Sequence, residues 1–190
     1  MLYLPILKLT SMETIHVKDK DFTISIKEEV ILKEVDRLAD ELNRDLADKE
    51  PMFLGVLNGS FMFMSDLMKR ITIPCQLQFM KVASYAGTDS TGKVTDLIGI
   101  DGDVKGRTVV IIEDIIDTGT TMKHLVDKLQ TLEPKEILIC TFLMKPNSLK
   151  VPLDVKYVAM SIPNDFILGY GLDYDGYGRN YPDIYTIVNQ

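Results

Sequence analysis

One stretch decides the fold of this chain: Val109-Val-Ile-Ile-Glu-Asp-Ile-Ile-Asp-Thr-Gly-Thr-Thr-Met122. Its opening run of β-branched residues predicts a buried strand over 108–112, which is followed by the adjacent carboxylates of Glu113 and Asp114. A third carboxylate, Asp117, precedes the hydroxyls and single glycine of 118–121, where a helix is predicted to begin. Carboxylates suit Mg²⁺ and sugar hydroxyls, and the N–H groups at a helix N-terminus suit phosphate. The stretch therefore offers what a phosphorylated, metal-bound sugar needs.

Predicted strands and helices alternate along the chain. Strands are predicted over 52–57, 76–84, 108–112, 136–143 and 155–160. Helices are predicted over 27–49, 61–70 and 120–132. This alternation predicts an α/β fold with a mostly parallel sheet that helices cover on both faces. The glycine-containing segments 87–93 and 162–179 are interpreted as loops.

Composition narrows the class of protein. The length fits one domain over 1–190, with 1–11 either native or an upstream extension ahead of Met12. A net charge of −7 argues against a general nucleic-acid binder, because phosphate contacts need a basic surface. Two cysteines without a C-x-x-C spacing favour free thiols in a reducing compartment, which predicts a cytoplasmic location. No apolar run reaches the roughly 18 residues of a membrane helix.

Glu113 and Asp114 could also be a generic acidic strand end, because adjacent acids follow strands in receiver domains and phosphatases as well. Two acids, two spacers, a third acid and Thr-Gly-Thr-Thr after an apolar run form a far more specific combination. It resembles the phosphoribosyl-pyrophosphate signature of the type I phosphoribosyltransferases. This resemblance implies a central, mostly parallel sheet flanked by helices. It also implies a small purine-binding hood, built from the N-terminal segment and about 162–190.

The resemblance gives each signature residue a role. Glu113 and Asp114 are implied to hold the ribose hydroxyls, directly or through Mg²⁺ and water. Backbone N–H groups and hydroxyls are implied to cradle the 5′-phosphate, from Asp117, Thr118, Gly119, Thr120 and Thr121. Asp117 is also implied to be the general base that takes the proton from purine N7.

The turn Leu57-Asn58-Gly59-Ser60 resembles the family's pyrophosphate loop, in which a strained peptide turns N–H groups toward the leaving group. Taken alone, Asn-Gly-Ser is an ordinary turn. Several relatives carry lysine at the position of Asn58, so this chain lacks one cation there. Ser84 and Tyr85 resemble the start of the catalytic lid, which excludes water from a ribosyl cation. The alternative for them is a solvated hairpin tip.

Lys145, at the end of a predicted strand, resembles the residue that donates to the purine 6-oxo oxygen. An ammonium offers only donors, which favours hypoxanthine and guanine over adenine. Taken alone, Lys145 would be an ordinary surface lysine. Many relatives carry an arginine shortly afterwards, which 146–149 lack.

The stretch from Phe166 to Tyr174 resembles the rest of the purine pocket. Phe166 is implied to stack on the base, and the carbonyls of Ile167 and Asp173 to face the purine 2-position. Asp173 is implied to ligate a second Mg²⁺, and Arg179 to contact the pyrophosphate. Singly, Phe166 also fits core packing and Asp173 an Asx turn. Together these motifs narrow the resemblance to the hypoxanthine-guanine phosphoribosyltransferases, over nearly the whole chain from about Val17.

The resemblance implies transfer of a phosphoribosyl group from phosphoribosyl pyrophosphate to N9 of a 6-oxopurine, in purine salvage. It implies Mg²⁺ as cofactor, a homodimer or homotetramer, and neither nucleic acid nor membrane as partner. Three alternatives stay open: xanthine or adenine as the base, a regulator that binds messenger RNA, and a non-catalytic homologue. The net charge argues against RNA, and the presence of Asp117, Lys145 and Asp173 argues against the non-catalytic homologue.

Overall fold

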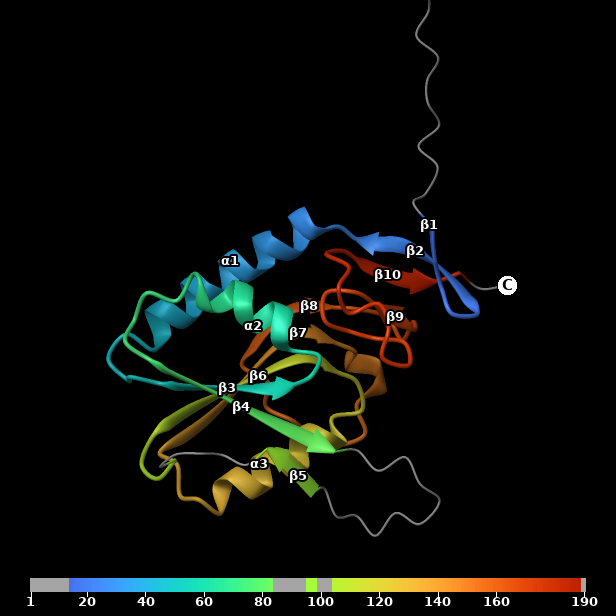
Figure 1. Cartoon of the computed structure of the whole chain (residues 1–190). Helices are drawn as coiled ribbons and strands as arrows, with labels where there is room; N and C mark the ends of the chain where they lie inside the picture. Colours follow the sequence, from blue (N-terminus) through green and yellow to red (C-terminus); the bar gives the residue numbers. More distant parts are fainter. Residues whose placement is uncertain (1–13, 84–94, 99–103, 189–190) are drawn as a thin grey trace, which may run out of the picture.

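The computed structural model describes residues 14–83, 95–98 and 104–188, and they form two sheets (Figure 1). The larger sheet has six strands in the order β5-β4-β3-β6-β7-β8. Its strands are β3 (Met52–Leu57), β4 (Gln76–Ala83), β5 (Thr95–Ile98), β6 (Thr108–Ile116), β7 (Glu136–Met144) and β8 (Tyr157–Ser161). All neighbours are parallel except β5, which runs antiparallel to β4. The carboxyl ends of β3, β4, β6, β7 and β8 therefore meet at one edge.

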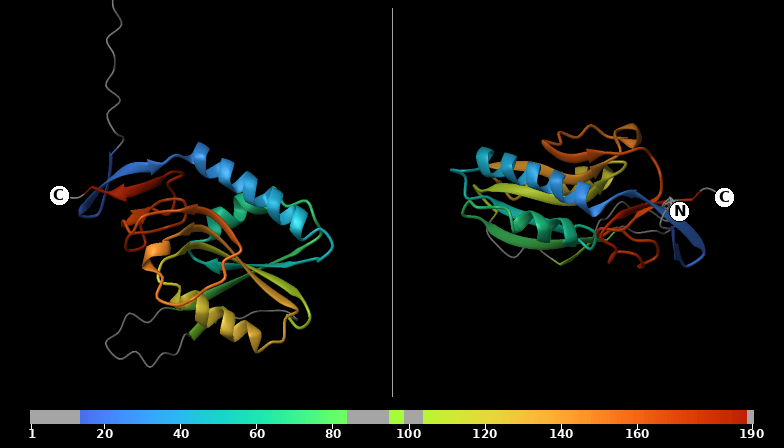
Figure 2. Two further views of the ribbon diagram at one scale, coloured as in Figure 1. Left: turned by 180° about the vertical axis from the view of Figure 1, so that it is seen from behind. Right: turned by 90° about the horizontal axis from the view of Figure 1, so that it is seen from above.

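Helices cover both faces of this sheet (Figures 1 and 2). One face carries α1 (Glu28–Asp45) and α2 (Phe61–Met68), and the other carries α3 (Thr120–Gln130). In β6, Val110 and Ile112 pack under α1 and α2, whereas Val109 and Ile111 pack under α3. This alternation follows from the two-residue period of a strand, and it explains why the apolar run is continuous. The predicted α/β fold is confirmed.

A second, antiparallel sheet stands beyond the carboxyl ends of the parallel strands, and we call it the hood (Figure 1). Its strands lie in the order β1-β2-β10-β9. They are β1 (Thr14–Val17), β2 (Lys20–Ile26), β9 (Ile167–Leu168) and β10 (Ile184–Ile187). The strands β1 and β2 come before α1, and β9 and β10 come after β8. The hood is therefore built from both ends of the described chain.

Several predicted boundaries were wrong. The strand predicted over 108–112 continues to Ile116, because β6 pairs with β7 as far as Ile116 opposite Met144. The acids therefore lie within the strand rather than after it. The helix predicted over 27–49 ends at Asp45, and the segment 162–179 contains the short strand β9. The loop predicted over 87–93 lies outside the described residues.

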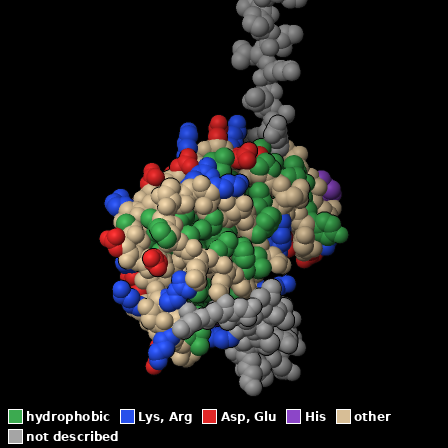
Figure 3. Space-filling model, turned by 60° about the vertical axis from the view of Figure 1, so that its left-hand side comes forward, with side chains coloured by type: hydrophobic (Ala, Val, Ile, Leu, Met, Phe, Trp, Pro, Cys, Tyr) green, Lys and Arg blue, Asp and Glu red, His purple; other side chains and the backbone are tan. Residues whose placement is uncertain are grey.

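The charge distribution on the surface and the length of the helices are further features of the fold. On the face shown in Figure 3, acidic and basic side chains are interspersed, and hydrophobic side chains lie among them. Among the described helices, none is both long and apolar enough to span a bilayer.

Candidate active site

Gly59, in the turn after β3, lies wedged between two other segments. A Cβ atom built on Gly59 would lie 1.6 Å from Asp114 Oδ2, and one built on Gly171 would lie 2.0 Å from the Gly59 carbonyl oxygen. Neither position has room for a side chain. The peptide bond between Leu57 and Asn58 is cis, and the Asn58 side chain is exposed. The predicted pyrophosphate loop therefore touches both the acidic strand and the C-terminal loop.

Glu113 and Asp114 are partly buried and adjacent. Burial raises the pKa of the Glu113 carboxyl well above its usual range, and the neighbouring Asp114 carboxyl raises it further. Burial also raises the pKa of Asp114, against the lowering effects of backbone N–H groups and of the Arg179 guanidinium. The Ile115 N–H donates to Asp114 Oδ1 at 2.9 Å. Because two such carboxyls resist full ionisation together, a cation or hydroxyl donors would stabilise their charged forms.

The start of α3 has a left-handed glycine and exposed threonines. Gly119 adopts a left-handed conformation with φ of 78°, directly before the first helical residue, Thr120. A Cβ atom there would lie 2.8 Å from Leu153 Cδ1, so a side chain at this position would also require Leu153 to move. Thr118 Oγ1 accepts the Thr120 N–H at 3.4 Å, and the side chains of Thr120 and Thr121 are exposed. The first N–H groups of a helix lack intrahelical acceptors and attract phosphate.

Lys145 is buried, so the surface-lysine interpretation was wrong. Its exposed fraction is 8%, and its backbone N–H donates to the Ile116 carbonyl at 2.9 Å, which continues the pairing of β7 with β6. Its Nζ donates to Asp117 Oδ2 at 2.9 Å, and about half of the Asp117 side chain is exposed. The predicted purine-reading ammonium and the predicted base are thus direct partners.

The loop of residues 169–179 closes on itself through Arg179. Arg179 Nη2 lies 2.6 Å from Asp173 Oδ1, and Nη1 donates to the Gly171 carbonyl at 2.7 Å. The Gly176 N–H donates to Asp173 Oδ2 at 2.6 Å, so Asp173 does anchor a turn as well. Asp173, a predicted metal ligand, and Arg179, a predicted pyrophosphate contact, therefore lie close to Gly171, which touches Gly59.

Phe166 lies on the hood with 44% of its surface exposed, so the core-packing interpretation was wrong. The Tyr174 ring meets it edge-on with centroids 5.6 Å apart, and the Phe22 ring lies 6.2 Å away. Sequence reasoning missed Phe22 and gave Tyr174 no role. The only signal was the aromatic content of the segment around Phe166. Ile167 is buried in β9, opposite Thr186.

The structure thus brings together Asp117 with Lys145, Gly59 with Asp114, and Arg179 with Asp173. Phe166 has its ring contacts within the hood. Ser84 and Tyr85 lie outside the described residues. Among those described, no group of three or more His, Cys, Asp and Glu side chains could hold a metal ion unaided.

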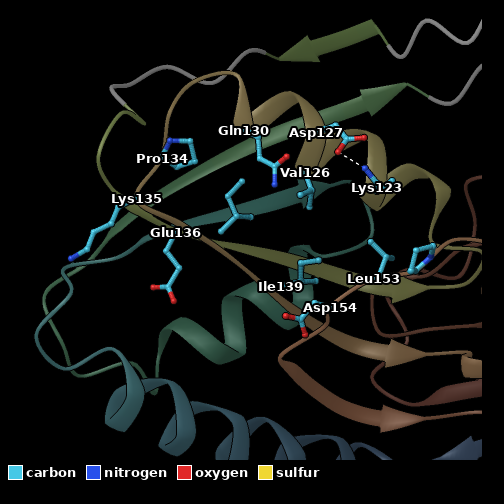
Figure 4. Close-up of a pocket in the computed structure, with 12 residues that line it drawn as sticks. Lys123, Val126, Asp127, Gln130, Pro134, Lys135, Glu136, Ile139, Leu153 and Asp154 are labelled. Carbon is cyan, nitrogen blue, oxygen red and sulfur yellow. Dashed lines mark hydrogen bonds and ion pairs between the residues drawn. The ribbon is translucent and has the colours of Figure 1, made fainter.

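A hollow of about 440 Å³ lies elsewhere, between α3, the start of β7 and 152–154 (Figure 4). Lys123 and Asp127 form an ion pair on its rim. Its lining includes none of the predicted site residues, because the start of β7 marks the amino edge of the sheet. Ligands of open parallel sheets bind at the opposite, carboxyl edge.

The strand order, the hood and the acids near the end of β6 define a phosphoribosyltransferase. The sequence model described as "Phosphoribosyl transferase domain" matches residues 25–175. A hypoxanthine-guanine phosphoribosyltransferase of Streptococcus pyogenes is 41% identical over 160 residues, covering 84% of this chain and 89% of that protein.

Two solved structures are similar over most of the chain. A hypoxanthine phosphoribosyltransferase of Staphylococcus aureus has a TM-score of 0.83 and 41% identity, covering 87% of this chain and 90% of that one. That of Trypanosoma cruzi has a TM-score of 0.83 and 31% identity, covering 92% and 95%. The chain belongs to the hypoxanthine-guanine phosphoribosyltransferase family.

Proposed function

We propose that this protein transfers the 5-phosphoribosyl group of phosphoribosyl pyrophosphate to N9 of hypoxanthine, with guanine as a second substrate. The products are IMP or GMP and pyrophosphate, and the role is purine salvage. The observation that carries the proposal is the convergence at Gly59. There, the turn after β3, the acids of β6 and the loop that bears Asp173 and Arg179 come into contact.

The three parts of phosphoribosyl pyrophosphate, which are the 5′-phosphate, the ribose and the pyrophosphate, can each be assigned to residues of the site. The N–H groups at the start of α3 and the hydroxyls of 118–121 would bind the 5′-phosphate. Glu113 and Asp114 would hold the ribose hydroxyls, at a distance from the phosphate set by the short connection between β6 and α3. The turn of Leu57, Asn58 and Gly59, together with Arg179, would hold the leaving pyrophosphate. This division of roles places ribose C1 between the pyrophosphate and the purine.

The ion pair of Lys145 and Asp117 would separate when the purine binds, and each side chain would contact a different atom of the base. The Lys145 ammonium would donate to the 6-oxo oxygen, while the more exposed Asp117 carboxylate would move to N7 and accept its proton as N9 bonds to C1. Adenine presents an amino group at the 6-position, which cannot accept from an ammonium. Phe166, with its exposed ring, would stack on the base at a strength of roughly 1–3 kcal/mol, as aromatic side chains do on other bases. The carbonyls of Ile167 and Asp173 would face the purine 2-position.

Glu113 and Asp114 would offer carboxylate oxygens to one Mg²⁺ and Asp173 to a second, and substrate phosphates and water would complete the coordination of each ion. When bound, Mg²⁺ would offset the charge of the leaving pyrophosphate. Asp173 accepts from Arg179 and Gly176 in the structure, so it would exchange the arginine contact for the cation. Arg179 would then turn to the pyrophosphate itself.

A second copy of this chain is the proposed partner, as a homodimer or homotetramer. α2 and β4 expose Phe61, Leu77 and Phe79, with 41%, 46% and 37% of their surfaces accessible. Together with Met64 and Met68, they line a groove of about 450 Å³. Exposed apolar patches of this kind usually mark contact surfaces. Light scattering should give a mass above that of one chain, and Leu77→Glu should lower it; a monomeric wild type would refute the proposal.

The domain organisation and the location of the protein are also proposed. The chain is proposed to be one phosphoribosyltransferase domain over 1–190, with the hood drawn from its N-terminal segment and from about 162–190. Cys75 and Cys140 are free thiols, which a reducing compartment maintains, and this supports the cytoplasm as the proposed location.

Nucleotide formation with Mg²⁺ and phosphoribosyl pyrophosphate tests the proposal, with hypoxanthine, guanine, xanthine and adenine assayed side by side. Activity with hypoxanthine and none with adenine is expected. Activity with xanthine or adenine alone would refute the substrate assignment but keep the reaction. Inactivity with all four bases, combined with RNA retention on a filter, would favour the regulator instead.

A further inference from the structure

Tyr170 is a buried aromatic residue inside the site loop that the proposed reaction does not use. Only 2% of its surface is exposed, and its backbone has a positive φ of 46°. Its neighbours Gly169 and Gly171 are also left-handed, and a Cβ atom on Gly169 would lie 2.0 Å from the Asp183 carbonyl oxygen. The loop is therefore folded tightly enough to push the Tyr170 ring into the interior.

The Tyr170 hydroxyl donates to Asp66 Oδ2 on α2 at 2.9 Å. Asp66 is itself fixed, because Lys69 Nζ lies 2.9 Å from its other carboxylate oxygen and Arg70 Nη1 donates to its carbonyl at 2.9 Å. Arg70 is in turn paired with Asp36 of α1. Burial and the Asp66 carboxylate raise the pKa of Tyr170, so the hydroxyl remains a donor at neutral pH. The hydrogen bond from Tyr170 therefore connects the loop to Asp66 of α2, whose position Lys69 and Arg70 stabilise.

An aromatic row reinforces the same connection. The Phe142 ring of β7 lies 4.9 Å from the Tyr170 ring and 5.4 Å from the Phe63 ring of α2. These three elements carry separate parts of the site: α2 begins directly after the pyrophosphate loop, β7 leads directly into Lys145, and the 169–179 loop carries Asp173 and Arg179.

We propose that Tyr170, through its hydrogen bond to Asp66, is a positioning residue that sets the gap between the pyrophosphate loop at Gly59 and the Asp173–Arg179 pair. Gly171, the next residue, touches the Gly59 carbonyl oxygen, so a shift of the Tyr170 anchor moves that contact directly. This inference rests on the function proposed above and on its assignment of the pyrophosphate site.

Tyr157 provides a matched control at the other edge of the sheet. It is also 2% exposed, and its hydroxyl donates to an aspartate, Asp45 Oδ2, at 3.1 Å. It lies at the start of β8, whereas the site lies at the carboxyl ends. Tyr170→Phe and Tyr157→Phe therefore each remove one buried tyrosine–aspartate hydrogen bond and keep the ring.

The experiment measures steady-state constants and melting temperatures for both variants. Tyr170→Phe should raise KM for phosphoribosyl pyrophosphate about five-fold, the size of one lost hydrogen bond, and leave the hypoxanthine KM within about two-fold. Asp66→Asn, with Tyr170 unchanged, keeps an acceptor for the tyrosine hydroxyl and should keep this KM close to the wild-type value. Tyr157→Phe should lower the melting temperature comparably and leave both KM values within about two-fold of wild type.

The inference would be overturned if the KM for phosphoribosyl pyrophosphate were unchanged in Tyr170→Phe, or if it rose equally in Tyr157→Phe. Asn58→Asp separates this failure from failure of the site assignment, because it adds a negative charge on an exposed side chain of the proposed loop. It should raise the same KM. If it does not, the pyrophosphate site is misassigned, and the inference about Tyr170 falls with it.

Discussion

Lys145 Nζ lies 2.9 Å from Asp117 Oδ2, so the proposed purine-reading cation and the proposed base neutralise each other in the free protein. Lys145 is buried while half of Asp117 is exposed, which means that the carboxylate is the partner with room to move. A 6-oxopurine offers a replacement for each half of the pair: an acceptor at O6 and a proton at N7. A base that lacks either group would still break the ion pair, but it would leave Lys145 or Asp117 without a new partner.

The first prediction concerns Lys145→Met, which keeps the length of the buried stem, and Lys145→Ala, which does not. Both variants remove the donor to O6 and should raise the hypoxanthine KM roughly ten- to hundred-fold, because hydrogen bonds to charged groups are the stronger ones. Inhibition by unsubstituted purine, which lacks the 6-oxo group, should change much less. Equal weakening of both ligands would contradict the role of Lys145.

The second prediction concerns Asp117→Asn. Its loss as a general base should lower kcat roughly hundred-fold, with little change in the KM for phosphoribosyl pyrophosphate. Asp127→Asn is the matched control, because Asp127 is an exposed partner of Lys123 further along α3. That variant should keep wild-type kcat. Unchanged turnover in Asp117→Asn would remove Asp117 from the mechanism.

Much of the central sheet could be predicted from local pattern. The strand over 52–57 was predicted with its observed bounds, because its apolar run is flanked by Pro51 and a turn. The hood was implied only by resemblance, because its strands are short and half-polar: β9 has two residues and β1 has four. The end of β6 was missed because pairing with β7 overrides the polarity of Glu113 and Asp114.

The site residues could be named from motifs, but their partners could not. Nothing local in the sequence pairs Arg179 with Asp173 or Tyr170 with Asp66, because these contacts depend on how loops pack after the sheet forms. The burial of Lys145 has the same origin. Its chain position suggested an exposed strand end, whereas pairing of its N–H with Ile116 draws it into the interior.

The third prediction concerns Gly59→Ala, whose new Cβ atom would lie 1.6 Å from Asp114 Oδ2. Either the loop or the acid must move, so we expect the KM for phosphoribosyl pyrophosphate to rise at least about ten-fold, the effect of roughly 1.4 kcal/mol. Gly106→Ala is the control, because Gly106 has open space around its Cβ position and only its positive φ of 72° opposes a side chain. It should lower stability by about 1 kcal/mol through its backbone conformation alone. Wild-type kinetics in Gly59→Ala would show that the contact has no functional role.

The fourth prediction concerns Asn58→Lys, which supplies the cation that several relatives carry. The Asn58 side chain is exposed and precedes Gly59, so an ammonium there can reach a pyrophosphate held by the loop. One added charge contact in a partly solvated site should tighten pyrophosphate binding about three- to ten-fold. Product inhibition by pyrophosphate measures this directly.

Gln130→Lys, at the exposed end of α3, makes the same change in net charge far from the strand ends and should leave inhibition unchanged. Raised ionic strength should reduce the gain in Asn58→Lys, because screening weakens exposed charge pairs. An equal gain in both variants would assign the effect to the overall charge of −7 rather than to the loop. Unchanged inhibition in both would place the pyrophosphate away from Asn58.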